Sequence, residues 1–212
     1  MRRFLVHLFL LLSLASPVTL AACVAPIYQY GDGTFIENLL ALPSGNILLS
    51  TFGSGNLVSI DPNARNPTPR NVAKLSTATG LTAIAELPGN LYAVGAGVHT
   101  EFGFANNSMA LFVVKVTGHQ PTGAVVASIP VPGTSMMNGL AALPRRPFTV
   151  LSADSIGGRL LRINTLTHQV DVAWTDPAIG SGGNMNIPLG INGLKIRGKW
   201  LYLACKRLSP TD

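Results

Sequence analysis

Cysteine and charge are both scarce in this sequence of 212 residues. It has two cysteines, Cys23 and Cys205, and charged residues make up 11% of the chain. Two cysteines do not form a disulfide framework, so a disulfide-stapled miniprotein is excluded; whether the two pair is left open. The 15 lysines and arginines are scattered and form no run. Because nucleic-acid binding needs a basic patch or stripe, we expect no nucleic-acid partner.

Long apolar runs are absent as well, except at the N-terminus. Arg2 and Arg3 precede the apolar residues 4–14, and small residues follow at TLA (19–21). This layout predicts a secretory signal peptide over residues 1–21, whose removal lowers the formal net charge from +6 to +4. Later segments fall short of the roughly 18 consecutive apolar residues of a membrane span. We therefore expect a secreted protein without a membrane span.

Two further features bear on the secretory route. LAAC (20–23) also has the form of a bacterial lipoprotein cleavage site, which would leave Cys23 lipidated if the protein is bacterial. Asn106 begins the triplet NNS (106–108), an acceptor for N-linked glycosylation in eukaryotic secreted proteins. We predict glycosylation at Asn106 and keep the lipoprotein anchor as the alternative for a bacterial source.

One short element recurs four times and indicates the fold. It reads ENLLALP (37–43), TAIAELP (82–88), NGLAALP (138–144) and NGLKIRG (192–198), at spacings of 45, 56 and 54 residues. A β-propeller blade repeats at about 40 to 50 residues. In a propeller the first strand of each blade lines the central channel, so the leading side chains of the four elements should converge there. These are Glu37, Thr82, Asn138 and Asn192.

Short β-rich runs separated by turn residues follow each element, as in ILLST (47–51) and RLLRIN (159–164). Such runs are typical of strands and turns rather than helices. We predict an all-β propeller with blades at residues 28–77, 78–133 and 134–180, a partial blade at 187–203 and a divergent tail at 204–212. A β-sandwich is the alternative, although sandwiches rarely repeat a motif at this period.

The chain is short for a propeller. At about 50 residues per blade it supplies about three and a half blades, whereas closed propellers have about four to eight. An open propeller exposes strand edges, which favours aggregation. The residues after Tyr202 also depart from the pattern of the preceding blade. We expect a truncated or altered end and a poorly stable 212-residue form.

Five segments resemble a known family: IEN (36–38), GLT (80–82), MNGL (137–140), VLSADS (150–155) and PLGINGL (188–194). They are similar to secreted fungal proteins of the senescence-marker-protein/gluconolactonase-like superfamily, which are six-bladed propellers. The resemblance extends over residues 28–202. Within that group the chain most resembles hetero-Diels–Alderases of tropolone–sesquiterpene biosynthesis, which need no redox cofactor. The wider superfamily contains metal-dependent lactonases.

The resemblance implies a set of site residues. Glu37, Asn138 and Asn192 match three metal ligands of the lactonases, and the remaining ligand, an Asp, would lie beyond Asp212. Carboxylate and amide oxygens suit calcium or magnesium best, with zinc as a further candidate cation. A purely structural alternative is that these side chains tie adjacent inner strands together through hydrogen bonds.

Three functions remain open on the sequence. The first is cofactor-free cyclisation of a small secondary metabolite, with Glu37, Asn138 and Asn192 orienting and polarising the substrate. The second is metal-dependent lactone hydrolysis, and the third is a binding or vestigial propeller without catalysis. In the first two, Thr82 and His99 are candidate substrate contacts, although His99 lies in a Gly-flanked loop that also suits a solvated turn or a pocket rim.

Overall fold

The computed structural model describes residues 25–31, 33–101, 103–181 and 189–205. Three sheets have four strands each, and every strand is antiparallel to its neighbours. The first contains β1 (Ile36–Ala41), β2 (Ile47–Thr51), β3 (Asn56–Ile60) and β4 (Arg70–Lys74). The second contains β5 (Gly80–Leu87), β6 (Leu91–Gly97), β9 (Ala110–Thr117) and β10 (Thr122–Pro130). The third contains β11 (Met137–Ala142), β12 (Thr149–Asp154), β13 (Arg159–Asn164) and β14 (Val170–Thr175).

The remaining elements are shorter. β15 (Ile191–Arg197) and β16 (Trp200–Cys205) form a two-stranded sheet, and a hairpin of β7 (His99–Thr100) and β8 (Gly103–Phe104) is inserted between β6 and β9. One turn of 3₁₀ helix, η1, spans Pro177–Ile179. The hairpin is a feature that the sequence patterns did not predict. β16 also continues through Ala204 and Cys205, which were predicted to belong to the divergent tail.

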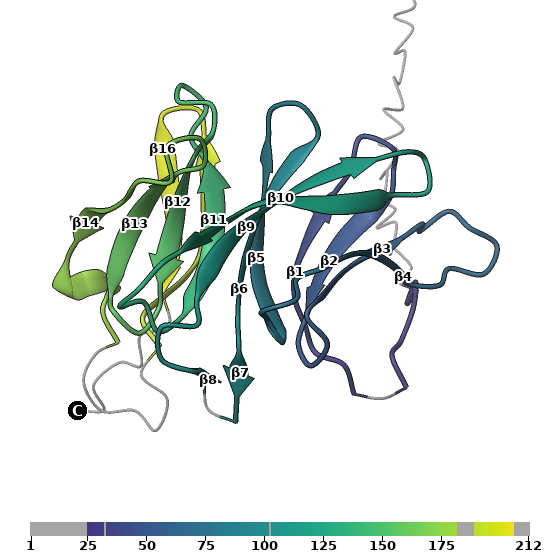
Figure 1. The fold of residues 1–212 in the computed structure, drawn as a ribbon, viewed down its shortest axis with the longest axis horizontal. Helices are drawn as coiled ribbons and strands as arrows, with labels where there is room; N and C mark the ends of the chain where they lie inside the picture. The colour runs from purple at the N-terminus through teal and green to yellow at the C-terminus, as the bar shows by residue number, and fades with distance from the viewer. Residues whose placement is uncertain (1–24, 32, 102, 182–188, 206–212) are drawn as a thin grey trace, which may run out of the picture.

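The sheets stand side by side like the blades of a fan (Figure 1). The first strands of the sheets, β1, β5, β11 and β15, contact one another in that order and form the inner side of the fan. This arrangement confirms the all-β propeller fold, because a two-layer sandwich does not place successive four-stranded sheets in a ring. We call the three four-stranded sheets and the sheet of β15 and β16 blades 1 to 4.

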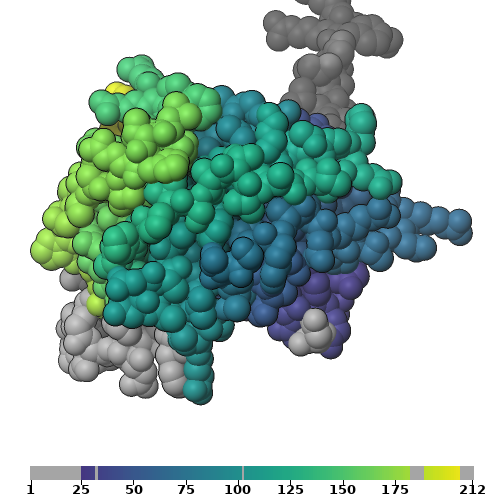
Figure 2. Space-filling view, viewed as in Figure 1, coloured from purple at the N-terminus to yellow at the C-terminus, as the bar shows by residue number. Residues whose placement is uncertain are grey.

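Alternation along the strands of blade 2 builds the core between blades. On β9, Phe112 and Val114 pack toward blade 1, whereas Leu111 and Val113 pack toward blade 3. Successive side chains of a strand point to opposite faces, so a strand of continuous apolar residues serves two interfaces. A third cluster joins blade 3 to β15 and β16 through Ile191 and Leu194. Figure 2 shows the teal and green segments of neighbouring blades packed together without a gap.

The side on which the innermost strands begin is the face that carries the candidate site. The innermost strands all begin on the same side as the β2–β3 turn (residues 53–55), the β12–β13 turn (155–158) and the β7–β8 hairpin. We call this side the loop face; the hairpin hangs from it at the bottom of Figure 1.

Some expectations lie outside the described residues. These are the signal peptide, the lipoprotein site at Cys23 and the tail after Cys205. Among the residues that the structure does describe, no helix has the length and apolar character needed to cross a membrane. Secretion, and glycosylation at the exposed Asn106, stay predictions.

Candidate functional site

Each of the four recurring polar residues lies at a β-bulge near the start of an innermost strand. The register between first and second strands shifts at Glu37 in β1, and at the equivalent pairs that begin with Thr82, Asn138 and Asn192. A bulge places an extra residue in one strand, re-aims its side chain, and is over-represented beside active sites. The repeat therefore encodes a backbone irregularity, and its polar residue sits on that irregularity in every blade.

Asn138 has a buried oxygen without a partner. Its side chain is 5% exposed, and its Oδ1 accepts no hydrogen bond from any described residue. Its Nδ2 lies 3.7 Å from the sulfur of Met136, a weak acceptor. A buried carbonyl oxygen without a donor costs about 1 to 3 kcal/mol. Such an atom is uncommon in a folded protein, and a ligand that approaches it would remove the penalty.

Thr82 differs from Asn138 although both are buried at the same position of the repeat. Its hydroxyl donates to the carbonyl oxygen of Gly95 at 3.1 Å, within its own blade. Its carbonyl oxygen accepts a hydrogen bond of 2.8 Å from the Ser50 hydroxyl of blade 1. The backbone of Thr82 therefore links blades 1 and 2, whereas its side chain links β5 to β6 within blade 2. Its role as a substrate contact stays a prediction.

Glu37 and Asn192 complete the set on β1 and β15. Both side chains are half-buried, and neither makes a hydrogen bond or an ion pair with a described residue. Burial raises the pKa of the Glu37 carboxyl, because partial removal from water disfavours its charged form. A cation beside Glu37 would reverse that effect by stabilising the carboxylate.

The glycine after Asn138 brings two of these strands together. A Cβ on Gly139 would lie 2.5 Å from the carbonyl oxygen of Asn192 and 2.9 Å from the amide nitrogen of Leu194. Only a residue without a side chain allows β11 and β15 to approach so closely. The equivalent Gly193 has open space instead, since its Cβ would meet only Ala204, at 3.9 Å. The same Asn-Gly pair thus has different surroundings in blades 3 and 4.

An open cavity of about 350 Å³ runs along the inner side of the fan. It is lined by residues that follow the bulge positions, among them Asn38 in β1, Ile84 in β5, Gly139 in β11 and Gly193 in β15. Lys195 and Tyr202 line it on the side of blade 4. The inner strands of all four blades therefore share one hollow, as expected for the channel side of a propeller.

His99 lies on the loop face, in β7. Its backbone N–H donates to the Thr79 hydroxyl at 2.8 Å, and its half-buried ring packs against Phe52 with ring centroids 4.5 Å apart. The side chains of His119 and His168 are exposed. The position of Phe52 was not predicted, because nothing in the repeat marks the residue that follows β2.

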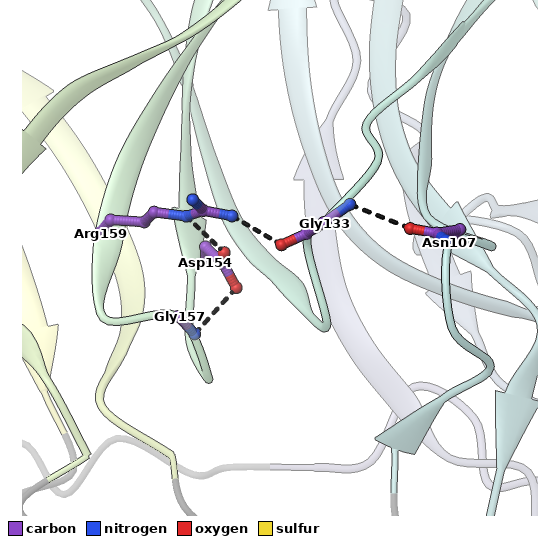
Figure 3. A network of polar contacts seen from close by, with 5 residues as sticks. All are labelled: Asn107, Gly133, Asp154, Gly157 and Arg159. Atoms are coloured by element: carbon purple, nitrogen blue, oxygen red, sulfur yellow. Dashed lines mark hydrogen bonds and ion pairs between the residues drawn. The ribbon is translucent and has the colours of Figure 1, made fainter.

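A polar network at the β12–β13 turn is structural (Figure 3). The fully buried Asp154 pairs with the Nε of Arg159 at 2.9 Å and accepts from the Gly157 N–H at 3.1 Å. Arg159 also donates to the carbonyl oxygen of Gly133 at 2.6 Å, and the Gly133 N–H donates to Oδ1 of Asn107 at 3.1 Å. Because both carboxylate oxygens of Asp154 are engaged, it anchors the β12–β13 turn and orients Arg159, which reaches Gly133.

The chemistry of the set can be compared with that of metal sites. Among the described residues, no group of three or more His, Cys, Asp or Glu side chains comes together. Glu37, Asn138 and Asn192 offer one carboxylate and two amide oxygens, the ligand type of calcium and magnesium. Zinc takes mostly nitrogen and sulfur ligands, so it fits this set poorly. The unpartnered Oδ1 of Asn138 is the observation that makes an oxygen-binding cation suitable here.

Comparison with known proteins supports the fold. No family model and no curated protein matches this chain. One solved structure that it resembles is described as a gluconolactonase from Xanthomonas campestris, with a TM-score of 0.53 and 11% sequence identity. The match covers 84% of this chain but 58% of that one, so this chain spans less than two thirds of its length. At this identity the likeness shows the fold alone: the sheets are arranged as in that structure.

Proposed function

We propose that the protein binds a small lactone at the start of its inner strands and hydrolyses it with a divalent cation, calcium or magnesium. One observation carries the proposal: Asn138 has a buried, unpartnered oxygen at the same bulge position where β1 carries Glu37 and β15 carries Asn192. The structural likeness to a gluconolactonase supports this hydrolysis more than it supports cyclisation.

In the proposed hydrolysis, the cation, Glu37 and the two asparagine carboxamides would each have a separate role. A divalent cation held by these oxygens would polarise the lactone carbonyl and make a bound water more acidic. Glu37 would supply the negative charge that holds the cation, and the two carboxamides would bind it through their oxygens. Glu37 and Asn192 are half-buried, and partial removal from water strengthens their electrostatic contacts. Because calcium takes about six to eight oxygen ligands, water, substrate or residues outside this set complete the shell.

The first experiment measures calcium and magnesium binding by isothermal titration calorimetry, together with lactone hydrolysis before and after EDTA. We expect binding, and hydrolysis that EDTA abolishes. Loss of groups that merely support a metal ligand lowers affinity by about 10- to 100-fold, so Glu37→Gln or Asn138→Leu should lower it at least that far. Asn66→Ala, at an exposed loop residue, is the matched control and should change neither. Hydrolysis that persists in EDTA would contradict the proposal.

Cyclisation stays a prediction from the sequence resemblance, because neither the contacts nor the comparisons test it. The same protein can be assayed with a quinone methide and an alkene in the presence of EDTA. Formation of the cyclised product without a cation, and no hydrolysis of lactones, would favour cyclisation. Calcium-dependent hydrolysis without cyclisation would favour the function proposed above.

A further inference from the structure

An open groove of about 830 Å³ lies on the loop face, beside blade 1. It lies close in sequence to the candidate site, because Phe35, which lines it, is two residues before Glu37. The N–H of Phe52 donates to the carbonyl oxygen of Phe35 at 3.1 Å and joins the two sides of the groove. Its volume is that of a site for a drug-sized ligand, about 300 to 1,000 Å³.

Aromatic rings gather along this groove although aromatic residues make up only 7% of the chain. The Phe52 ring packs against Phe35, with centroids 5.4 Å apart, and against His99 at 4.5 Å. The Phe104 ring contacts both: its centroid lies 5.8 Å from that of Phe52 and 5.6 Å from that of His99. These are the separations of interacting aromatic pairs. Blade 1 supplies Phe52, whereas the hairpin of blade 2 supplies His99 and Phe104.

The hairpin is packed in place by two glycines. A Cβ on Gly80 would lie 2.9 Å from the Cβ of His99 and 3.1 Å from the Phe104 ring, and one on Gly97 would lie 3.0 Å from that ring. The missing side chains at the start of β5 and the end of β6 therefore make room for Phe104. The backbone of His99 is therefore held in place by packing of the hairpin against β5 and β6.

The polarity of the groove restricts its ligand. Among the described residues that line it there is no Asp, Glu, Lys or Arg; its polar side chains include Thr51, Ser54 and Asn71. Neither imidazole nitrogen of His99 makes a hydrogen bond to a described residue. The lining thus offers ring faces, hydroxyl and amide groups, and one imidazole, but no described charge to neutralise an ionic ligand. Burial of an unpaired ionic group in such a lining would be unfavourable.

We propose that this groove binds an uncharged, planar aromatic or conjugated ring that carries a carbonyl or hydroxyl oxygen, with the ring against Phe52 and the oxygen hydrogen-bonded to His99. Combined with the proposed function, on which this step rests, the substrate is an aryl-bearing lactone rather than a sugar lactone. The part that reacts would then extend from the groove toward Glu37.

The test measures binding in EDTA by ligand-observed NMR, so that it does not depend on a cation. The probes are dihydrocoumarin, a neutral aryl lactone; glucono-δ-lactone, neutral but not aromatic; and phenylacetate, aromatic but anionic. We expect dihydrocoumarin to bind about 10-fold more tightly than either of the others. Equal affinities for dihydrocoumarin and glucono-δ-lactone, or no binding of dihydrocoumarin, would overturn the proposal.

Two variants separate the ring from the hydrogen bond. His99→Phe keeps a ring and removes the hydrogen-bonding nitrogens, so dihydrocoumarin affinity should fall about 2- to 10-fold, as expected for one hydrogen bond. Phe52→Leu removes the ring and should lower it by a further factor of about 2 to 10. Trp200→Leu, at an exposed aromatic residue of β16, is the control and should leave affinity unchanged. Unchanged affinity in both groove variants, with thermal unfolding like that of the wild type, would overturn the proposal.

The two proposals fail in different experiments. Hydrolysis of glucono-δ-lactone that needs calcium, without preferential dihydrocoumarin binding, would overturn the groove assignment and leave the proposed function standing. Preferential dihydrocoumarin binding that His99→Phe weakens, without calcium-dependent hydrolysis, would support the groove and overturn the proposed function.

Discussion

The innermost strands of blades 2 and 3 carry buried polar side chains in the same position of the repeat, yet only one of them is satisfied. The Thr82 hydroxyl donates to Gly95 inside its own blade, whereas Oδ1 of Asn138 has no donor among the described residues. A shared position therefore does not imply a shared role. The Thr82 side chain is engaged inside blade 2, and Asn138 retains the free acceptor that a ligand needs.

The two glycines that follow the asparagines should give the largest difference. Gly139→Ala places a Cβ against the backbone of Asn192, and overpacking of this kind lowers the free energy of unfolding by about 1 to 3 kcal/mol. Gly193→Ala meets only ordinary contacts and should change it by less than about 1 kcal/mol in either direction. Urea unfolding of both variants measures the difference. Equal effects would show that β11 and β15 do not approach as described.

The same pair also tests the site. Because Gly139 sets the approach of β11 to β15, Gly139→Ala should separate Asn138 from Asn192 and weaken calcium binding, whereas Gly193→Ala should not. Calcium titration of the two folded variants provides the measurement. A purely structural role for Gly139 would lower stability and leave calcium affinity unchanged.

The next difference concerns the two polar side chains themselves. Thr82→Val removes a satisfied hydrogen bond and leaves the Gly95 carbonyl without that donor, so the free energy of unfolding should fall by about 1 kcal/mol. Asn138→Leu removes an unpartnered buried acceptor, so in EDTA the stability should stay unchanged or rise by up to about 1 kcal/mol. Thermal unfolding in EDTA measures both. A clear loss of stability in Asn138→Leu would mean that its oxygen has a partner in solution.

The smallest expected effect is the pH dependence of Glu37. Burial raises its pKa in the folded protein, so its contribution to stability is fully present below the pKa of the unfolded chain and is lost as the pH rises through the folded value. In EDTA, Glu37→Gln should therefore be more stable than the wild type at neutral pH and equal to it near pH 3. Added calcium should reverse the order at neutral pH. Chemical unfolding across this pH range gives the comparison.

Much of the fold could be predicted because the signal was local and periodic. The recurring elements at residues 37–43, 82–88, 138–144 and 192–198 each begin within an innermost strand, and the runs at 47–51 and 159–164 coincide with β2 and β13. The alternation of apolar residues explains this success, since it records which face of a strand is buried. The hairpin of β7 and β8 was missed because its strands have two residues each, too few to show a period.

The sequence alone determined the strands, their grouping into blades and the position of the polar residue in each repeat, because these follow from spacing and alternation along the chain. Tertiary structure decided what each polar residue does. The hydrogen bond of Ser50 to Thr82, the free oxygen of Asn138 and the meeting of Phe52 with His99 all join segments from different strands or blades. Such contacts depend on how blades pack, and no local pattern in one blade records the side chains that the next blade brings to it.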